Sequence, residues 1–574
     1  MSIGIAPDTL RQASETVRRA SGLDRGQTSA PRRNAGPSAW SVIRWLVGSA
    51  LAVWAFAPFV ITALDASRRG AVFLGVDGQY PMDGLQYLAW IRDAADHGLI
   101  RNLFGTANGA LFVHPLWTIS GVVQAVTGVG PALLLASWKA LSVGVLFAGC
   151  SRLVTRYVTA QSPTRRAAAL LLALFGGLTP LVGALVTMDP GQAAPDFQRA
   201  AGDIVPAASL WGYAPLAIAV GLMPFAIEGF EAIIAGSARR RTTLRTSVLG
   251  LLIAWLHPWQ GETLVAVCAG LALLVWHDRR RNAAGPHSVY RRRGVGPRSP
   301  LWDRRQRGAM LAVCAATTAP IIYYFALSRL DPGWRTSEQA SVGAARIPWP
   351  VLVTCIGPIA LGLVAASRRA NADERLRPLL LWGLCCMVTV GLSFSGQYHA
   401  IDGVAAPLGV LAVAAWPPCR GLWRRLLAST CVFLALAPTA VFAVRSLSRL
   451  QGSPVTQYTE LNHSDVRAAV LAARHARGGM LLAPVALGTA IPALTDSASW
   501  VGHPIWTPDH LHREVDAQRL FSGEMDTSQA RAFVSRTGAR AIVEPCAYTG
   551  QIASALAGLG FGQQRVGCAR IFVR

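Results

Sequence analysis

Long apolar runs alternate with short polar stretches between residues 42 and 448. A run of about 20 apolar residues is long enough for an α-helix to cross the hydrocarbon core of a bilayer. The predicted spans are 42–65, 131–151, 167–188, 208–235, two within 246–276, 308–328, 349–366, 378–396, 404–417 and 426–445. Because the run 246–276 has arginines at both ends, we expect a hairpin of two short helices that turns at Pro258. The pattern predicts a mainly α-helical, polytopic transmembrane bundle of about 11 spans.

Arginine clusters all fall at one end of these spans, as in cytoplasmic loops under the positive-inside rule. They stand at 152–166, 238–245, 278–307, 367–377 and 419–425. Residues 1–41 are polar and basic and are expected to be a disordered cytoplasmic tail. The transmembrane domain, 42–448, then has its first loop, 66–115, outside. We therefore predict a multi-pass protein of the cell membrane whose N-terminus is cytoplasmic and whose C-terminal part is extracytoplasmic.

The composition supports this picture. The 574-residue chain is 52% hydrophobic and only 15% charged, whereas about 25% is charged in an average soluble protein. Its net charge of +24 is concentrated in the arginine clusters between spans, so nucleic-acid binding is not expected. Glu228 and Glu231 fall near the cytoplasmic end of their span, where pairing with nearby arginines is the plainest interpretation.

Residues 449–574 have a different pattern, with helix-like and strand-like segments in alternation. The segments are "HSDVRAAVLAARHA", "GMLLAP", "TSQARAFVSRTGARAIVEP" and "GCARIFVR". Such alternation predicts a small extracytoplasmic α/β domain. Cys546 and Cys568 could pair there, since disulfides persist in oxidising compartments, or they could be two free thiols.

The first loop contains a carboxylate-rich stretch, "YPMDGLQYLAWIRDAADHG" at 80–98. Its apolar positions fall largely on one side of a helix: Leu85, Leu88, Ala89 and Ile91. A helix of this kind is expected to lie flat on the outer membrane surface. Asp83 could cap its N-terminus, with Gln86 at capping-box spacing. It could also be a carboxylate held at the helix start for chemistry.

The stretch "GQYPMDGLQYLAWIRDA" resembles the first external loop of the GT-C glycosyltransferases, which include oligosaccharyltransferases, protein mannosyltransferases and arabinosyltransferases. In that superfamily an Asp or Glu follows the first span and starts a surface helix, often with aromatic residues close behind. Asp83 and Tyr87 match this arrangement, and so do the many spans and the outer C-terminal domain. "WVGHPIWTPD" at 500–509 is similar to segments in the outer domains of bacterial GT-C-like membrane proteins.

This resemblance implies that a sugar moves from a polyprenyl-phosphate donor to a glycan, lipid or protein acceptor at the outer face of the membrane. An acceptor hydroxyl needs a base to take its proton, and a nearby carboxylate can serve. By resemblance Asp83 is that base, in a single displacement with inversion. Asp77 competes for the role, although "GVDGQ" is also typical of a turn in which Asp bonds its own backbone. The sequence contains no Walker or Rossmann fingerprint, so no nucleotide pocket is predicted.

Lys139 is the only lysine in the chain and lies inside an apolar span. An intramembrane cation is by default a functional hypothesis, and Lys139 could meet the donor phosphate as a point charge. It could equally snorkel to the outer surface or pair with an Asp of the first loop.

Other polar residues of the outer loops are weaker candidates for substrate binding, and each could instead be a packing or interfacial residue. These residues are His114, His257, Glu262 and His399, and His399 shares a short loop with Asp402. The candidates for substrate binding are these four residues together with Tyr87 and Lys139. Asp189 and Asp196 could help to bind a metal ion or the acceptor. No spacing typical of a metal site appears, so no metal ligand is assigned, and a divalent metal ion is the only candidate cofactor.

Two other classes of protein have this many spans. A transporter or lipid flippase could use Lys139 and buried carboxylates, but it would more often show inverted repeats and broken helices at the midplane. A non-catalytic scaffold would have no reason to gather Asp and His in its outer loops. Glycosyl transfer is therefore the preferred function, with a transporter or flippase as the alternative.

Overall fold

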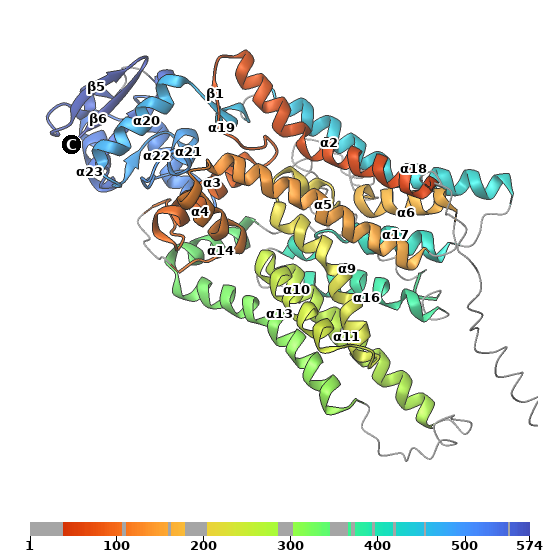
Figure 1. Cartoon of the computed structure of the whole chain (residues 1–574). Coiled ribbons are helices and arrows are strands. Elements are labelled where there is room, and N and C mark those ends of the chain that lie inside the picture. The colour runs from red at the N-terminus through yellow and green to blue at the C-terminus, as the bar shows by residue number, and fades with distance from the viewer. Residues whose placement is uncertain are drawn as a thin grey trace, which may run out of the picture.

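The structure of the chain is a computed structural model, and it describes most of the sequence. The described residues are 38–105, 111–158, 162–177, 204–284, 302–344, 366–368, 373–392, 397–416, 421–452, 455–548 and 552–574. Long helices form a bundle, and a smaller α/β region stands at one end of it (Figure 1). The start of helix α2 lies at the opposite end of the bundle from this region.

Helices dominate the bundle. They are α2 (Ala39–Arg68), α3 (Pro81–His97), α4 (Pro115–Thr127), α5 (Pro131–Tyr157), α6 (Pro163–Phe175), α9 (Ala214–Ile234), α10 (Arg240–Leu256), α11 (Pro258–Ala284), α13 (Arg304–Leu330), α14 (Pro332–Ala344), α16 (Arg377–Leu392), α17 (Ala405–Ala415) and α18 (Leu422–Arg449). Short 3-10 turns are η1 (Ala208–Trp211), η2 (Glu374–Leu376) and η3 (Gln397–Ile401). Among the described residues, six helices are long and apolar enough to cross a membrane: α2, α5, α9, α11, α13 and α18. The chain is therefore a membrane protein.

Every predicted span that falls within the described ranges overlaps a helix of the bundle, although α6, α10, α16 and α17 are not among these six. The predicted break at Pro258 is confirmed, because α10 ends at Leu256 and α11 begins at Pro258. The second helix is not short as expected, since α11 has 27 residues and extends to Ala284. The predicted span 349–366, apart from its last residue, lies outside the described residues, and so do the ends of the predicted spans 167–188, 378–396 and 404–417. The total of eleven spans stays a prediction.

The C-terminal region is the expected α/β unit. Its helices are α19 (Thr456–Thr459), α20 (His463–Ala476), α21 (Val485–Leu494), α22 (His510–Phe521), α23 (Thr527–Thr537) and α24 (Ala553–Leu556), with the 3-10 turn η4 (Cys546–Tyr548). Its strands are β3 (Leu481–Leu482), β4 (Ala541–Glu544), β5 (Gly562–Val566) and β6 (Ala569–Val573), in the order β3-β4-β6-β5. Strands β3 and β4 are parallel, and the other pairs are antiparallel.

A disulfide joins Cys546 and Cys568, which decides between the two alternatives left open by the sequence. The bond ties the start of η4 to the turn between β5 and β6. Disulfides persist mainly in oxidising compartments, so the bond favours an extracytoplasmic location for this region.

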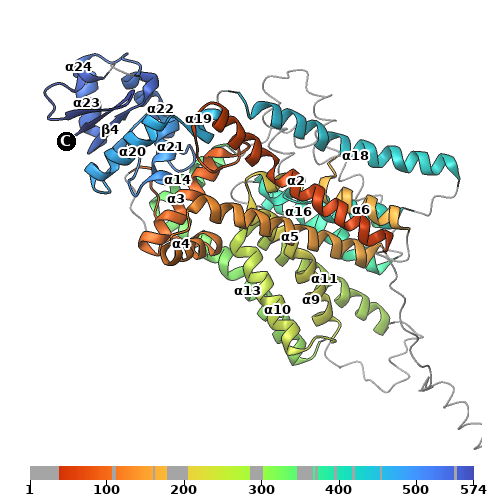
Figure 2. The same cartoon turned by 45° about the horizontal axis from the view of Figure 1, so that its top comes forward.

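The first loop and the C-terminal region are built into one another. Strand β1 (Val72–Phe73) pairs antiparallel with β2 (Glu460–Leu461). Helix α3 packs against α21, as both views show (Figures 1 and 2). Residues about 400 positions apart in the chain therefore form one layer at this end of the bundle.

The amphipathic pattern predicted that helix α3 lies on the membrane surface with its apolar side toward the lipid. This prediction is wrong, because other parts of the chain cover that side. Leu85 and Leu88 are buried in a cluster with Ala490 and Ala493 of α21. Ile91, further along the helix, belongs to the main core of the bundle. The sequence pattern shows that these residues are buried, but it cannot say whether lipid or another part of the chain covers them.

The other end of the bundle carries the expected ion pairs. Arg152 Nε on α5 lies 2.8 Å from Glu228 Oε2 on α9, and Arg156 donates to Glu231 over 2.7 Å. The interpretation of Glu228 and Glu231 as partners of nearby arginines is confirmed.

Candidate functional site

Asp83 is the third residue of α3. The helix begins at Pro81, because proline at the first position presets the helical φ angle, and Tyr80 is the N-cap residue. The predicted N-cap role of Asp83 is therefore wrong. Gln86 forms no capping box either, since its amide is buried and makes no hydrogen bond within the described residues. Asp83 remains in the first turn, where the helix dipole stabilises a carboxylate.

Two side chains from distant parts of the chain hold the Asp83 carboxylate. The hydroxyl of Tyr213, which precedes α9, donates to Oδ2 over 3.2 Å. Nε2 of His503, from the C-terminal region, lies 3.3 Å from Oδ1. The side chain of Asp83 stays 28% exposed, whereas that of His503 is only 2% exposed. The carboxylate is thus oriented on two sides and still reachable from outside.

The turn around His503 determines which ring nitrogen donates. The backbone N–H of Ile505 donates to Nδ1 of His503 over 3.2 Å. Because Nδ1 accepts, the proton of the neutral ring sits on Nε2, which then donates to Asp83. The carbonyl of His503 accepts from the N–H of Thr507 over 2.9 Å. The turn therefore presents a fixed donor to Asp83.

Tyr213 is positioned by close aromatic packing. Its ring lies 4.5 Å from the ring of Tyr80, centroid to centroid. The residue between it and η1 is Gly212, with φ +150°, and a Cβ there would lie 2.9 Å from the Tyr80 side chain. Just before it, Trp211 stacks on Trp54 of α2 at 4.4 Å. Only glycine leaves room for Tyr80 at this point.

Asp77 and Lys139 form a buried ion pair. The side chains of Asp77 and Lys139 are 5% and 9% exposed, and the Lys139 ammonium also donates to the carbonyl of Ala55 over 3.1 Å. Pairing with an Asp of the first loop is one of the alternatives that the sequence left open for Lys139. Both residues line a small cavity between α2, α3, α5 and α9, and Gly84 also lines it, next to Asp83.

A row of stacked rings leads away from Asp83. Tyr87, one turn after Asp83, stacks on Trp117 of α4 with 4.4 Å between centroids, and Trp117 stacks on His114 at 5.2 Å. Burial lowers the pKa of His114 to about 3, so its ring is neutral at physiological pH. The ring of His114 donates a hydrogen bond to the backbone carbonyl of Leu256, at the end of α10. Tyr87 and His114, both named as candidates from the sequence, therefore lie in one stack of rings with Trp117 between them.

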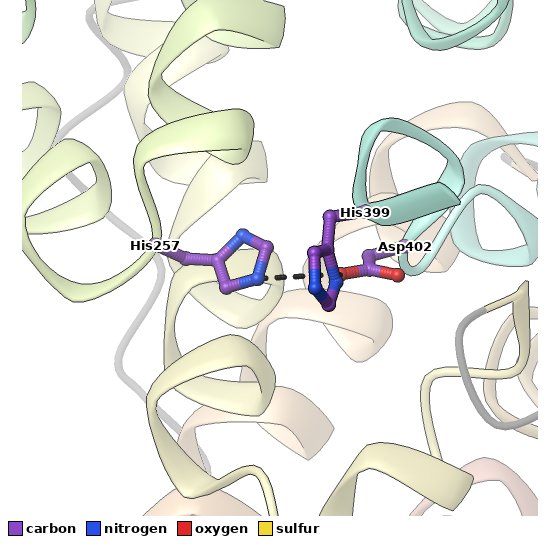
Figure 3. Close-up of side chains that lie close together, drawn as sticks. All are labelled: His257, His399 and Asp402. Carbon is purple, nitrogen blue, oxygen red and sulfur yellow. Dashed lines mark hydrogen bonds and ion pairs between the residues drawn. The ribbon is translucent and has the colours of Figure 1, made fainter. Parts of the chain in front are cut away.

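His257, His399 and Asp402 meet at the corner between α10 and α11. Nε2 of His257 and Nδ1 of His399 each lie 3.2 Å from Oδ2 of Asp402. Figure 3 shows the two imidazoles approaching the carboxylate from different elements. Asp402 is completely buried. Two of the weaker sequence candidates are therefore close neighbours, with Asp402 between them.

The remaining candidates are less well placed. Glu262 is half-buried, five residues into α11, and forms no hydrogen bond or ion pair within the part of the chain that the structure describes. Asp189 and Asp196 lie outside the described residues.

No prediction from the sequence named His503 or Tyr213. A sequence signal for His503 does exist, since the chain contains three His-Pro dipeptides, at His114, His257 and His503. The residue before proline is restricted to extended backbone, so each of these histidines stands at a break in the chain. Each is followed by a tryptophan two or three positions on. In the structure all three take part in the contacts described above.

No protein-family model matches the sequence, and none of the curated proteins does. Among solved structures, the apo oligosaccharyltransferase of Archaeoglobus fulgidus is similar at 14% identity and a TM-score of 0.41, covering 91% of this chain and 73% of that one. The oligosaccharyltransferase AglB from Archaeoglobus fulgidus, in complex with an inhibitory peptide and a dolichol-phosphate, has 16% identity and a TM-score of 0.37, with 85% and 69% covered. The Archaeoglobus fulgidus enzyme in complex with Zn and sulfate has 13% identity and a TM-score of 0.40, with 83% and 66% covered.

These structural neighbours are all oligosaccharyltransferases. Their identities to this chain do not exceed 16% and their TM-scores do not exceed 0.41. The function of this chain therefore has to be derived from its own residues.

Proposed function

We propose that this protein is a membrane glycosyltransferase that moves a sugar from a polyprenyl-phosphate donor to an acceptor on the outer face of the membrane, with Asp83 as general base. The observation that carries the proposal is the Asp83 carboxylate itself. It is 28% exposed, yet His503 and Tyr213 orient it from two other parts of the chain. A general base needs such a fixed and reachable carboxylate.

Asp77 is less suited to that role. Its carboxylate is only 5% exposed and is paired with Lys139, so an acceptor hydroxyl cannot reach it without breaking the pair. The same pair weakens the case for Lys139 as the ligand of the donor phosphate, because the ammonium is already neutralised. The burial of Asp77 and its pairing with Lys139 both support Asp83 as the base. In this proposal the ion pair has a structural role.

The proposed reaction is a single displacement. The acceptor oxygen attacks the anomeric carbon of the sugar while its proton moves to Asp83. The bond from the anomeric carbon to the phosphate oxygen breaks, and polyprenyl phosphate leaves with that electron pair. The anomeric configuration inverts. The Nε2–H of His503 and the Tyr213 hydroxyl hold the carboxylate in place for this proton transfer.

Transfer and transport can be separated in one assay. The purified protein in proteoliposomes is supplied with a polyprenyl-phosphate sugar, and free polyprenyl phosphate is measured in the presence of an acceptor mixture from the cell envelope. A glycosyltransferase releases polyprenyl phosphate, whereas a flippase or transporter moves the intact lipid across the bilayer without releasing it. Movement of intact donor without release would contradict the proposal.

His503 is expected to act as a positioning residue. His503→Ala removes one of the two groups that hold Asp83, and a misplaced catalytic group commonly costs about tenfold or more in turnover. The loss should appear in kcat with little change in KM for the donor. His503→Gln can still donate a hydrogen bond and should recover part of the rate. Equal rates for His503→Ala and wild type would remove His503 from the site.

The proposed orientation predicts a labelling pattern. Leu99→Cys and Glu524→Cys place thiols at exposed positions at the end of the bundle that holds Asp83. Ser237→Cys places a thiol at the arginine-rich end. A membrane-impermeant maleimide added to intact cells should label the first two and spare the third. The reverse pattern would put Asp83 on the cytoplasmic side and contradict the proposed reaction.

A further inference from the structure

We propose that His257, His399 and Asp402 form a binding site for a divalent cation of the zinc class. One donor atom from each residue lies within 4.8 Å of the others. Figure 3 shows the three side chains converging, His257 from the corner of α10 and α11 and the other two from η3 and the residue after it. The site is built from other residues than those that hold Asp83, and the proposal does not depend on the function proposed above.

Two of the three spacings between donor atoms suit a small tetrahedral ion. Ligand bonds of about 2.0–2.1 Å put neighbouring ligands of a tetrahedral site about 3.3 Å apart. Nε2 of His257 and Nδ1 of His399 are each 3.2 Å from Oδ2 of Asp402. Imidazole nitrogens and a carboxylate oxygen are common zinc ligands, and three protein ligands leave one position for water.

Unsatisfied atoms at the site also point to a bound cation. Asp402 is 0% exposed, and its Oδ1 has no hydrogen-bond partner within the described residues. Burial of a carboxylate without full compensation is costly. With a cation on Oδ2, the water molecule in its fourth position would donate a hydrogen bond to Oδ1. A plain hydrogen-bonded triad, in which both histidines donate to Oδ2, would leave Oδ1 bare.

The chain holds the three ligands in place before any ion binds. Pro258 keeps His257 in extended backbone at the break between α10 and α11. The amide of Gln260 donates to the carbonyl of Asp402 over 2.7 Å and fixes the second ligand loop against α11. Gly403 follows with φ +72°, and a Cβ there would lie 2.6 Å from Val220. The ligand geometry is therefore built from rigid elements.

Metal binding to the full-length, untagged protein tests the site. The protein in detergent is stripped with a chelator, dialysed against Zn²⁺ and analysed for bound metal; Co²⁺ is the spectroscopic probe. Wild type should keep one equivalent of zinc and give the visible bands of tetrahedral Co²⁺. His257→Gln, His399→Gln and Asp402→Asn should each lose both signals.

His97→Gln is the matched control. His97 Nδ1 lies 3.1 Å from Asp93 Oδ1, a similar His–Asp contact without a second histidine. This variant should bind zinc like wild type. Equal zinc content in the control and in the three site variants would overturn the proposal.

The wild-type protein also decides the matter if a site variant does not fold. Its thermal midpoint should rise with Zn²⁺ and not with Mg²⁺, because Mg²⁺ prefers octahedral oxygen ligands. No rise with Zn²⁺, together with no retained zinc, would show that the three side chains are only a hydrogen-bonded triad.

Discussion

The Asp83→Asn variant should fold as wild type does and lose about 100-fold or more in turnover. The amide keeps the shape of the side chain, and its oxygen can still accept a hydrogen bond from Tyr213 or His503. It cannot take up the acceptor's proton. The loss of a carboxylate from the first turn of α3 should cost less than about 1 kcal/mol of stability, because the helix dipole acts on it at a partly exposed position.

The measurement is release of polyprenyl phosphate in proteoliposomes, combined with the thermal midpoint of each purified variant. Asp96→Asn is the matched control, since Asp96 lies on the same helix and is exposed. It should transfer sugar at the wild-type rate. A near-normal rate for Asp83→Asn would leave no reason to call Asp83 a base.

The second large effect concerns the buried pair of Asp77 and Lys139. Removal of one partner leaves a buried charge uncompensated, which commonly costs about 3–5 kcal/mol. Lys139→Met and Asp77→Asn should therefore each lower the thermal stability of the protein strongly. The double variant removes both charges and should be more stable than either single variant.

Thermal unfolding in detergent of the two single variants and the double variant measures this effect. The apparent KM for the lipid donor, measured on the folded double variant, then separates the two hypotheses for Lys139. A structural pair predicts an unchanged KM. A KM raised about tenfold or more, which corresponds to the loss of a charge-assisted contact, would restore Lys139 as a phosphate ligand. Additive losses in the three variants would contradict the pairing itself.

Local patterns made much of the fold predictable from the sequence. Apolar runs and arginine clusters located the helices because both signals act within one span. The segment "HSDVRAAVLAARHA" is helix α20 from its first residue to its last. The start of α3 was missed, although Pro81 is a residue typical of the first helical position.

The site itself was predictable only in part. Asp83 was proposed as the base because it stands in a recognisable loop, but His503 is 420 residues away, and nothing in either stretch says that they meet. The choice between the alternatives for Lys139 also depended on tertiary packing, which places Asp77 beside it. His257 and His399 were each proposed singly. Their convergence on Asp402 depends on how the α10–α11 corner faces η3.

The contact between Asp83 and His503 has a consequence for biogenesis. The ribosome makes the loop with Asp83 early and the turn with His503 only after another 420 residues. Strand β2 and helix α21, which fasten that turn beside the first loop, are also made late. A nascent chain that has inserted only its first spans would carry a loosely held carboxylate and no assembled centre. If Asp83 is the base, as proposed, activity would begin only when the C-terminal region has folded against the first loop, so a truncated product could not consume the lipid donor.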